Sequence, residues 1–236
     1  MRDGIPADTT HYRAGSIRRV CRGHRTVASW LRRLSLVVAV LVLASCSSNG
    51  GANVQTTTTA AGDERMPFGY QTAWLAIRTE DGAAVANVLG LSGIERRNWE
   101  GVESSYRHGV FVAPSIDGWT LAVGVDLLTA PHHPNTALLS RMLHTEVQWF
   151  ETEHVSETHG WARSAGGNLV REFEYVGDSD EVTANTGRVS TVERRLKFLQ
   201  PDESTVVRLA AAWSVDPTEL KGRDPRLGWF GTLPAP

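Results

Sequence analysis

The chain has 236 residues, with 24 basic and 26 acidic side chains, eight tryptophans and only two cysteines, Cys21 and Cys46. A chain of this length can bury a substantial core as one domain. The near balance of charge speaks against a nucleic-acid-binding protein, because that class neutralises phosphates with an excess of Lys and Arg.

An apolar run near the N-terminus is the strongest local signal. Leu34 to Ala44 holds a single polar residue, Ser35, and is preceded by Arg32 and Arg33. The order of charged segment, short apolar segment and small residues is typical of a bacterial secretory signal. The run is too short for a spanning helix, which needs about 20 residues. A buried core helix is the alternative, but such a helix should carry a polar face.

The four residues that end this run, Leu43-Ala44-Ser45-Cys46, resemble the lipobox of bacterial lipoproteins. The resemblance implies that residues 1–45 are a signal peptide and that cleavage occurs before Cys46. It also implies that the Cys46 thiol carries a diacylglycerol, which anchors the protein to the cell membrane on its extracytoplasmic side. Loss of residues 1–45 removes eight arginines and two aspartates, leaving 16 basic and 24 acidic residues and a net charge of −8. No nucleic-acid partner is expected for such a domain.

This processing would leave no cysteine free for a disulfide, a metal site or a nucleophile. The segment that follows Cys46 contains no large apolar residue except Val54. Such a composition cannot bury enough surface to offset the entropy of ordering, so residues 46–65 are predicted to form a flexible tether. A single globular domain is expected over residues 66–236.

The first half of that domain has clear strand and helix signals. Residues 72–78 are apolar on both faces and predict a central strand. Asp81 is a good N-cap for a helix over 82–89. Strands at 109–113 and 119–125 are expected to form a hairpin, because Pro and Asp-Gly lie in the connection between them. Residues 90–108 are predicted to be a loop region.

The second half continues the pattern of hairpins and helices. In the strand at 168–176, one face should hold Leu169, Phe173 and Tyr175, while Glu172 and Glu174 lie on the opposite, solvated face. Residues 178–187 are polar and predicted to be a loop. The other expected elements are helices at 134–144, 191–198 and 202–213, strands at 147–152 and 154–165, and an irregular aromatic C-terminal segment at 228–230. The sequence therefore predicts an α+β fold, with a mainly antiparallel sheet of about six strands and about four packed helices.

A second pattern runs from His159 to Glu193. It consists of His159 to Ala162, then Arg171 to Gly177, then Gly187 and Glu193. This pattern resembles uncharacterised bacterial α+β proteins. The resemblance implies no activity and no site residues.

No residue of the sequence can be assigned as catalytic, and no metal site or cofactor is expected. The histidines His132, His133, His144, His154 and His159 lack the tight spacing of zinc sites. There is no GxSxG, no SxxK and no phosphate-binding glycine loop in the right context. Two carboxylate pairs, Glu151 with Glu153 and Glu172 with Glu174, have the i, i+2 spacing that places both acids on one face of a strand. That arrangement suits acid–base hydrolysis, but it is also what a solvated strand face looks like.

Two tryptophans are the candidate binding residues. Trp99 and Trp229 lie outside the predicted elements, and exposed tryptophans are typical of contact surfaces. The alternative is that both cover the edge of the core.

The leading hypothesis is a lipid-anchored extracytoplasmic domain that binds a protein or a small ligand, with no catalysis evident. One alternative is an envelope or extracellular hydrolase that uses the strand carboxylates. Another is an immunity-type protein that neutralises a toxin. Acids with perturbed pKa values would favour the enzyme, and an exposed apolar surface would favour the binder.

Overall fold

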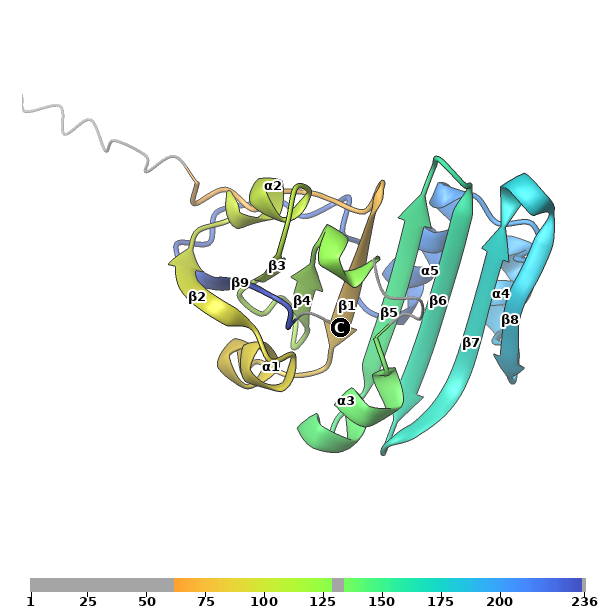
Figure 1. Cartoon of the computed structure of the whole chain (residues 1–236), viewed down its shortest axis with the longest axis horizontal. Coiled ribbons are helices and arrows are strands. Elements are labelled where there is room, and N and C mark those ends of the chain that lie inside the picture. The colour runs from red at the N-terminus through yellow and green to blue at the C-terminus, as the bar shows by residue number, and fades with distance from the viewer. Residues whose placement is uncertain (1–61, 129–133, 235–236) are drawn as a thin grey trace, which may run out of the picture. The chain divides into compact units, whose positions relative to one another are not determined.

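The computed structural model describes residues 62–128 and 134–234, all of which belong to a unit that begins at Gln55 (Figure 1). The predicted signal peptide, the lipobox with Cys46 and residues 46–61 of the predicted tether lie outside these residues. None of the helices in the described ranges is long and apolar enough to cross a membrane.

One antiparallel sheet of nine strands forms the centre of this unit, in the order β2-β9-β3-β4-β1-β5-β6-β7-β8. The strands are β1 (Thr72–Ile77), β2 (Ser92–Arg97), β3 (Val110–Val112), β4 (Thr120–Val123), β5 (Val147–Glu153), β6 (Thr158–Ala165), β7 (Asn168–Val176), β8 (Glu181–Gly187) and β9 (Gly228–Thr232). The α+β class and the antiparallel sheet are therefore confirmed. The predicted number of about six strands was too low.

Helices cover both faces of the sheet (Figure 1). The α-helices of the described residues are α1 (Gly82–Val88), α2 (Gly101–Ser105), α3 (Thr136–Leu143), α4 (Thr191–Leu196) and α5 (Glu203–Trp213), one more than the four expected. Residues of α1 and α3 pack into one core, while residues of α2 and α5 pack into the other, with Phe198 just after α4. We call these the α3 face and the α5 face of the sheet.

Strand β1 lies at the middle of the sheet and contributes side chains to both hydrophobic cores. Trp74 and Ala76 belong to the core on the α5 face, while Leu75 and Ile77 belong to the core on the α3 face. All six residues of β1 are buried. The prediction of a central strand that is apolar on both faces is confirmed.

Local signals also placed a helix start and a turn correctly. The Asp81 carboxylate accepts a hydrogen bond of 2.9 Å from the backbone N–H of Ala84, which caps α1. In the β3–β4 connection, Asp117 and Gly118 both have positive φ, at 50° and 81°. Glycine and aspartate tolerate this conformation better than most residues do.

Residues just before the predicted domain boundary at residue 66 already contact the folded unit. The carbonyl of Asp63 accepts a hydrogen bond of 2.7 Å from the backbone of Asp224, and the Asp63 carboxylate lies 3.0 Å from the Arg223 guanidinium. These contacts fall in the C-terminal end of the predicted tether. Its last four residues, 62–65, are tied to the segment before β9 by contacts that composition alone does not reveal.

Candidate functional site

Helix α4 is fixed to the sheet by a buried ion pair. Arg171 on β7 donates from Nε to Oε1 of Glu193 on α4 at 2.6 Å, and the two side chains are 1% and 0% exposed. The same oxygen accepts a hydrogen bond of 3.0 Å from the indole N–H of Trp161 on β6. The second oxygen of Glu193 accepts one of 2.6 Å from the backbone N–H of Ser190, which completes a capping box.

The Arg171 guanidinium also reaches the last strand of the sheet. Its Nη1 donates to Oδ1 of Asn185 and to the carbonyl of Thr186, both at 2.9 Å. Arg171 therefore joins β7, β8 and α4 through one group. This network brings together three residues of the sequence pattern between 159 and 193, namely Trp161, Arg171 and Glu193. These three members of the pattern therefore hold α4 against the sheet.

A pocket of about 850 Å³ lies where β7 and β8 face the end of α4 and the residues after it. Its apolar lining consists of Tyr175, Val182, Phe198 and Leu199. Val182 is 42% exposed and Leu199 is 61% exposed, although both are large apolar side chains. Pockets that take small ligands have volumes of about 300–1,000 Å³ and a mostly apolar lining with a few polar groups. We call this site the α4 pocket.

The α4 pocket is lined by both negatively and positively charged side chains. The Asp180 carboxylate accepts hydrogen bonds from the Tyr175 hydroxyl at 2.9 Å and from the Gln200 amide at 3.4 Å. The hydrogen bond to Asp180 raises the pKa of Tyr175, so its hydroxyl remains a donor at neutral pH. Arg194 and Lys197 supply two positive charges.

The two cations differ in how they are held. Arg194 donates to the carbonyl of Val189 at 2.7 Å and to the hydroxyl of Thr191 at 3.1 Å, which holds its guanidinium near the start of α4. Lys197 ends α4 in the left-handed conformation, with φ of 55°. Among the described residues its ammonium group has no carboxylate partner.

The predicted carboxylate pairs form a second polar region, on the α3 face of the sheet. Glu151 on β5 and Glu174 on β7 are both paired across the sheet with Gly160 on β6. Because Gly160 has no side chain, the Trp149 ring covers it, at 3.0 Å from where a Cβ would stand. The prediction that Glu172 and Glu174 lie opposite the buried Phe173 and Tyr175 agrees with the alternating burial of β7.

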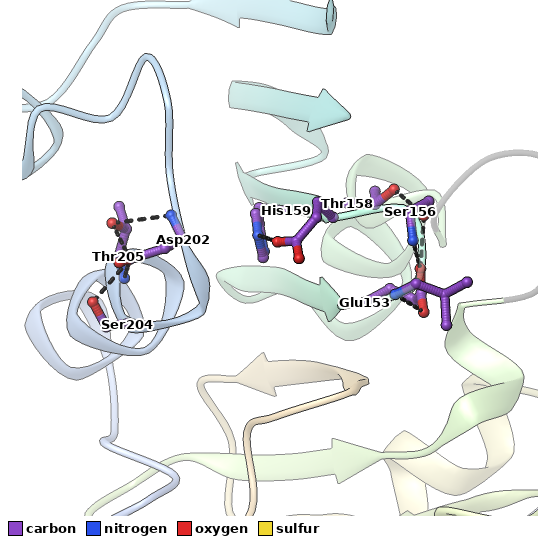
Figure 2. A network of polar contacts seen from close by, with 9 residues as sticks. Glu153, Ser156, Thr158, His159, Asp202, Ser204 and Thr205 are labelled. Carbon is purple, nitrogen blue, oxygen red and sulfur yellow. Dashed lines mark hydrogen bonds and ion pairs between the residues drawn. The ribbon is translucent and has the colours of Figure 1, made fainter. Parts of the chain in front are cut away.

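Burial acts very differently on two of these acids. Burial, together with the nearby charges of Glu174 and Glu153, raises the pKa of Glu151 to about 8. Partial burial also raises the pKa of Glu153, but hydrogen bonds from Ser156 and Val155 outweigh this effect, so the pKa falls below its usual value. Figure 2 shows Glu153 closing the β5–β6 turn, with bonds of 2.8 Å and 2.6 Å from the backbone and hydroxyl of Ser156.

The raised pKa of Glu151 predicts a dependence of stability on pH. The folded state holds this proton more tightly than the unfolded state does, so the contribution to stability is complete below about 4.5 and is lost as the pH rises to about 8. We expect the free energy of unfolding to fall more between pH 5 and pH 9 in the parent protein than in Glu151→Gln. Urea unfolding at the two pH values measures this difference. Equal falls in both proteins would contradict the prediction.

Histidines contribute no metal site among residues 62–128 and 134–234, where no three His, Cys, Asp or Glu side chains are grouped around one point. His144 and His154 are exposed, and His132 and His133 lie outside the described residues. His159 is buried on β6, with its Nε2 at 3.6 Å from the Glu157 carboxylate (Figure 2). The Asp202 group in the same figure is the N-cap of α5.

The two candidate tryptophans have different environments. Trp99 is fully buried and packs edge-on against Phe111 at 6.0 Å, so it offers no contact surface and covers the core instead. Trp229 lies on β9 and is half-buried, with the Arg96 guanidinium 4.0 Å above its ring. Trp229 therefore remains accessible in part, but one face of its ring is covered by Arg96.

The residues of the α4 pocket were missed in the sequence. Val182 lies in a segment predicted to be a loop, and Leu199 precedes a proline between two helices. A useful signal would have been the run from Arg188 to Lys197, which has four cations in an otherwise acidic domain. No family model, no curated protein and no solved structure matches the chain.

Proposed function

We propose that this chain is a lipid-anchored extracytoplasmic binding protein, and that its folded domain holds a small ligand in the α4 pocket. The observation that carries the proposal is a pocket of about 850 Å³ whose walls expose Val182 and Leu199 to solvent. Exposed large apolar side chains in a concave site with a few charges are typical of ligand sites. The buried Arg171–Glu193 pair gives this site a rigid wall, because it fixes α4 against the sheet.

A solvatochromic dye tests the pocket without knowledge of the natural ligand. We expect Nile red, which is neutral and apolar, to bind at one saturable site with a blue-shifted emission. Leu199→Asp should abolish that site, because it places a charge on the apolar wall. Val155→Asp is the matched control, since Val155 is 76% exposed and does not line the pocket. Unchanged binding to Leu199→Asp would refute the pocket as the site.

The anchor is tested separately. The lipobox supports a diacylglycerol thioether on Cys46, and two acyl chains are enough for stable membrane attachment, at about 0.8 kcal/mol per buried CH₂. We expect a mature N-terminus that begins at Cys46 with the mass of the lipid added, and no lipid labelling of Cys46→Ala. Mass spectrometry of the protein purified from membranes decides this. An unmodified Cys46, or a mature chain that begins elsewhere, would overturn the anchor.

The contrast between Glu151 and Glu153 supports a second candidate, a hydrolase. A carboxyl with a pKa of about 8 is protonated at neutral pH and suits a general acid, while Glu153, whose pKa is lowered, stays ionised. Such an enzyme should lose its activity in Glu151→Gln and keep its ability to bind Nile red. Equal activity of this variant and the parent on a panel of glycosides and esters would remove the candidate.

A further inference from the structure

One segment beside the α4 pocket, residues 188–197, carries net positive charge, although the domain as a whole is acidic. Four exposed cations lie between residues 188 and 197, namely Arg188, Arg194, Arg195 and Lys197. The one acid of the same segment, Glu193, is buried and already neutralised by Arg171. The positive charge of these four side chains therefore faces solvent without an acidic partner from within the segment.

Two of these cations, Arg194 and Lys197, line the pocket beside its apolar wall. The only carboxylate among the lining residues, Asp180, already accepts hydrogen bonds from Tyr175 and Gln200. Within the part of the chain that the structure describes, the Lys197 ammonium group donates no hydrogen bond, so its three donors are available to a ligand. A ligand that fits must therefore offer apolar surface to Val182 and Leu199 and a negative charge to Lys197.

On the basis of the proposed binding function, we propose that the ligand of the α4 pocket is an amphipathic anion, with a hydrophobic body and one carboxylate or phosphate head. A charge-assisted hydrogen bond to Lys197 is shorter and stronger than one between neutral groups. A cationic ligand would meet the like charges of Arg194 and Lys197, and a neutral apolar ligand would leave the Lys197 ammonium without a counter-charge. The head group therefore sets the selectivity, and the apolar wall supplies much of the affinity.

Two ligands that differ in the head group test this most directly. Dodecanoate and dodecanol have the same chain, and only the first is charged at pH 7.5. Titration calorimetry below the micelle concentration uses residues 46–236 with Cys46→Ser, so that no covalent lipid competes. The described residues build both cores within this part of the chain. We expect dodecanoate to bind once per chain and at least about tenfold more tightly than dodecanol, a difference of about 1.4 kcal/mol.

Substitutions assign the selectivity to a residue. Lys197→Asn removes the charge while keeping a residue that tolerates positive φ, and it should bring dodecanoate to within about twofold of dodecanol. Arg195→Gln is the matched control, because Arg195 is an exposed cation of the same helix that does not line the pocket. It should leave the selectivity unchanged at physiological ionic strength, where separated exposed charges are screened.

The outcomes separate this inference from the proposed function. Equal affinity for dodecanol and dodecanoate, lost in Leu199→Asp, would overturn the anionic head but keep the pocket. Absence of binding by either ligand, together with absence of Nile red binding, would overturn both. Vesicles that contain phosphatidylglycerol, compared with phosphatidylcholine alone, distinguish the source of the anion. Binding to the anionic vesicles that dodecanoate competes away would place the ligand in the bilayer, and binding of dodecanoate alone would make it a free molecule.

Discussion

Replacing Glu193 with Ala should destabilise the protein by about 3–5 kcal/mol, because it leaves the Arg171 guanidinium buried without its counter-charge. Arg171 is 1% exposed and cannot turn to solvent without opening the contact between α4 and the sheet. The substitution also removes the acceptor of the Trp161 indole N–H and half of the capping box. Urea unfolding measures the loss, and Nile red binding should weaken with it, since α4 forms a wall of the pocket.

A double variant separates the ion pair from the space that it fills. Replacing both partners, as in Arg171→Met with Glu193→Leu, removes both buried charges and keeps most of the volume. Such replacements are often neutral or stabilising, so the double variant should recover most of the stability that Glu193→Ala loses. If Glu193→Ala lowers the free energy of unfolding by less than about 1 kcal/mol, the ion pair is not desolvated as described.

Replacing Trp74 with Ala should cost about 3–5 kcal/mol, because it empties the middle of the core on the α5 face. The Trp74 ring stacks on Phe150 at 5.2 Å and meets Phe68 edge-on at 6.0 Å, and the side chain is fully buried. Thermal or urea unfolding gives the change in free energy.

Two other substitutions control this experiment. Trp74→Phe keeps an aromatic ring and removes an indole N–H that donates to none of the described residues, so it should cost much less than Trp74→Ala. Met142→Ala, on the exposed side of α3, should change stability by less than about 0.5 kcal/mol. A loss near zero for Trp74→Ala would contradict the central position of β1.

Periodicity predicted the elements that bury side chains. Strand β1 is apolar at every position, and β7 alternates between Phe173 or Tyr175 and Glu172 or Glu174. In β1, and in β7 from Glu172 to Tyr175, the pattern of apolar residues matches the pattern of burial. At the start of β7 it does not, because Leu169 and Val170 are exposed while Arg171 is buried. A helix was also expected at 134–144 and α3 is found there, but only part of its apolar surface is buried: Leu139 faces the core, while Leu138 and Met142 are exposed.

The three strands that were missed lack this pattern. Strands β2 and β8 are the edges of the sheet, and β2 reads Ser-Gly-Ile-Glu-Arg-Arg with five of its six residues exposed. An edge strand gains its backbone hydrogen bonds from one neighbour and buries little, so its composition resembles that of a loop. Strand β9 contains two glycines in five residues, and its pairing with β2 and β3 brings together segments more than a hundred residues apart.

The candidate site was predictable only in part. The i, i+2 spacing correctly indicated that Glu151 and Glu153 share a strand, but not that burial would raise one pKa and turn hydrogen bonds would lower the other. The α4 pocket depends on β8, which was expected to be a loop. Without β8, nothing in the sequence places Val182 beside Leu199.

The most direct test of ligand binding in the α4 pocket is a map of where an apolar anion contacts the folded protein. Backbone amide NMR of ¹⁵N-labelled protein titrated with dodecanoate gives this map. We expect saturable shifts concentrated at Val182, Lys197 and Leu199, with little change at Glu151 and Gly160 on the α3 face. Shifts concentrated around Glu151 and Gly160, with none at Val182 and Leu199, would contradict the account and place the ligand on the carboxylate face instead.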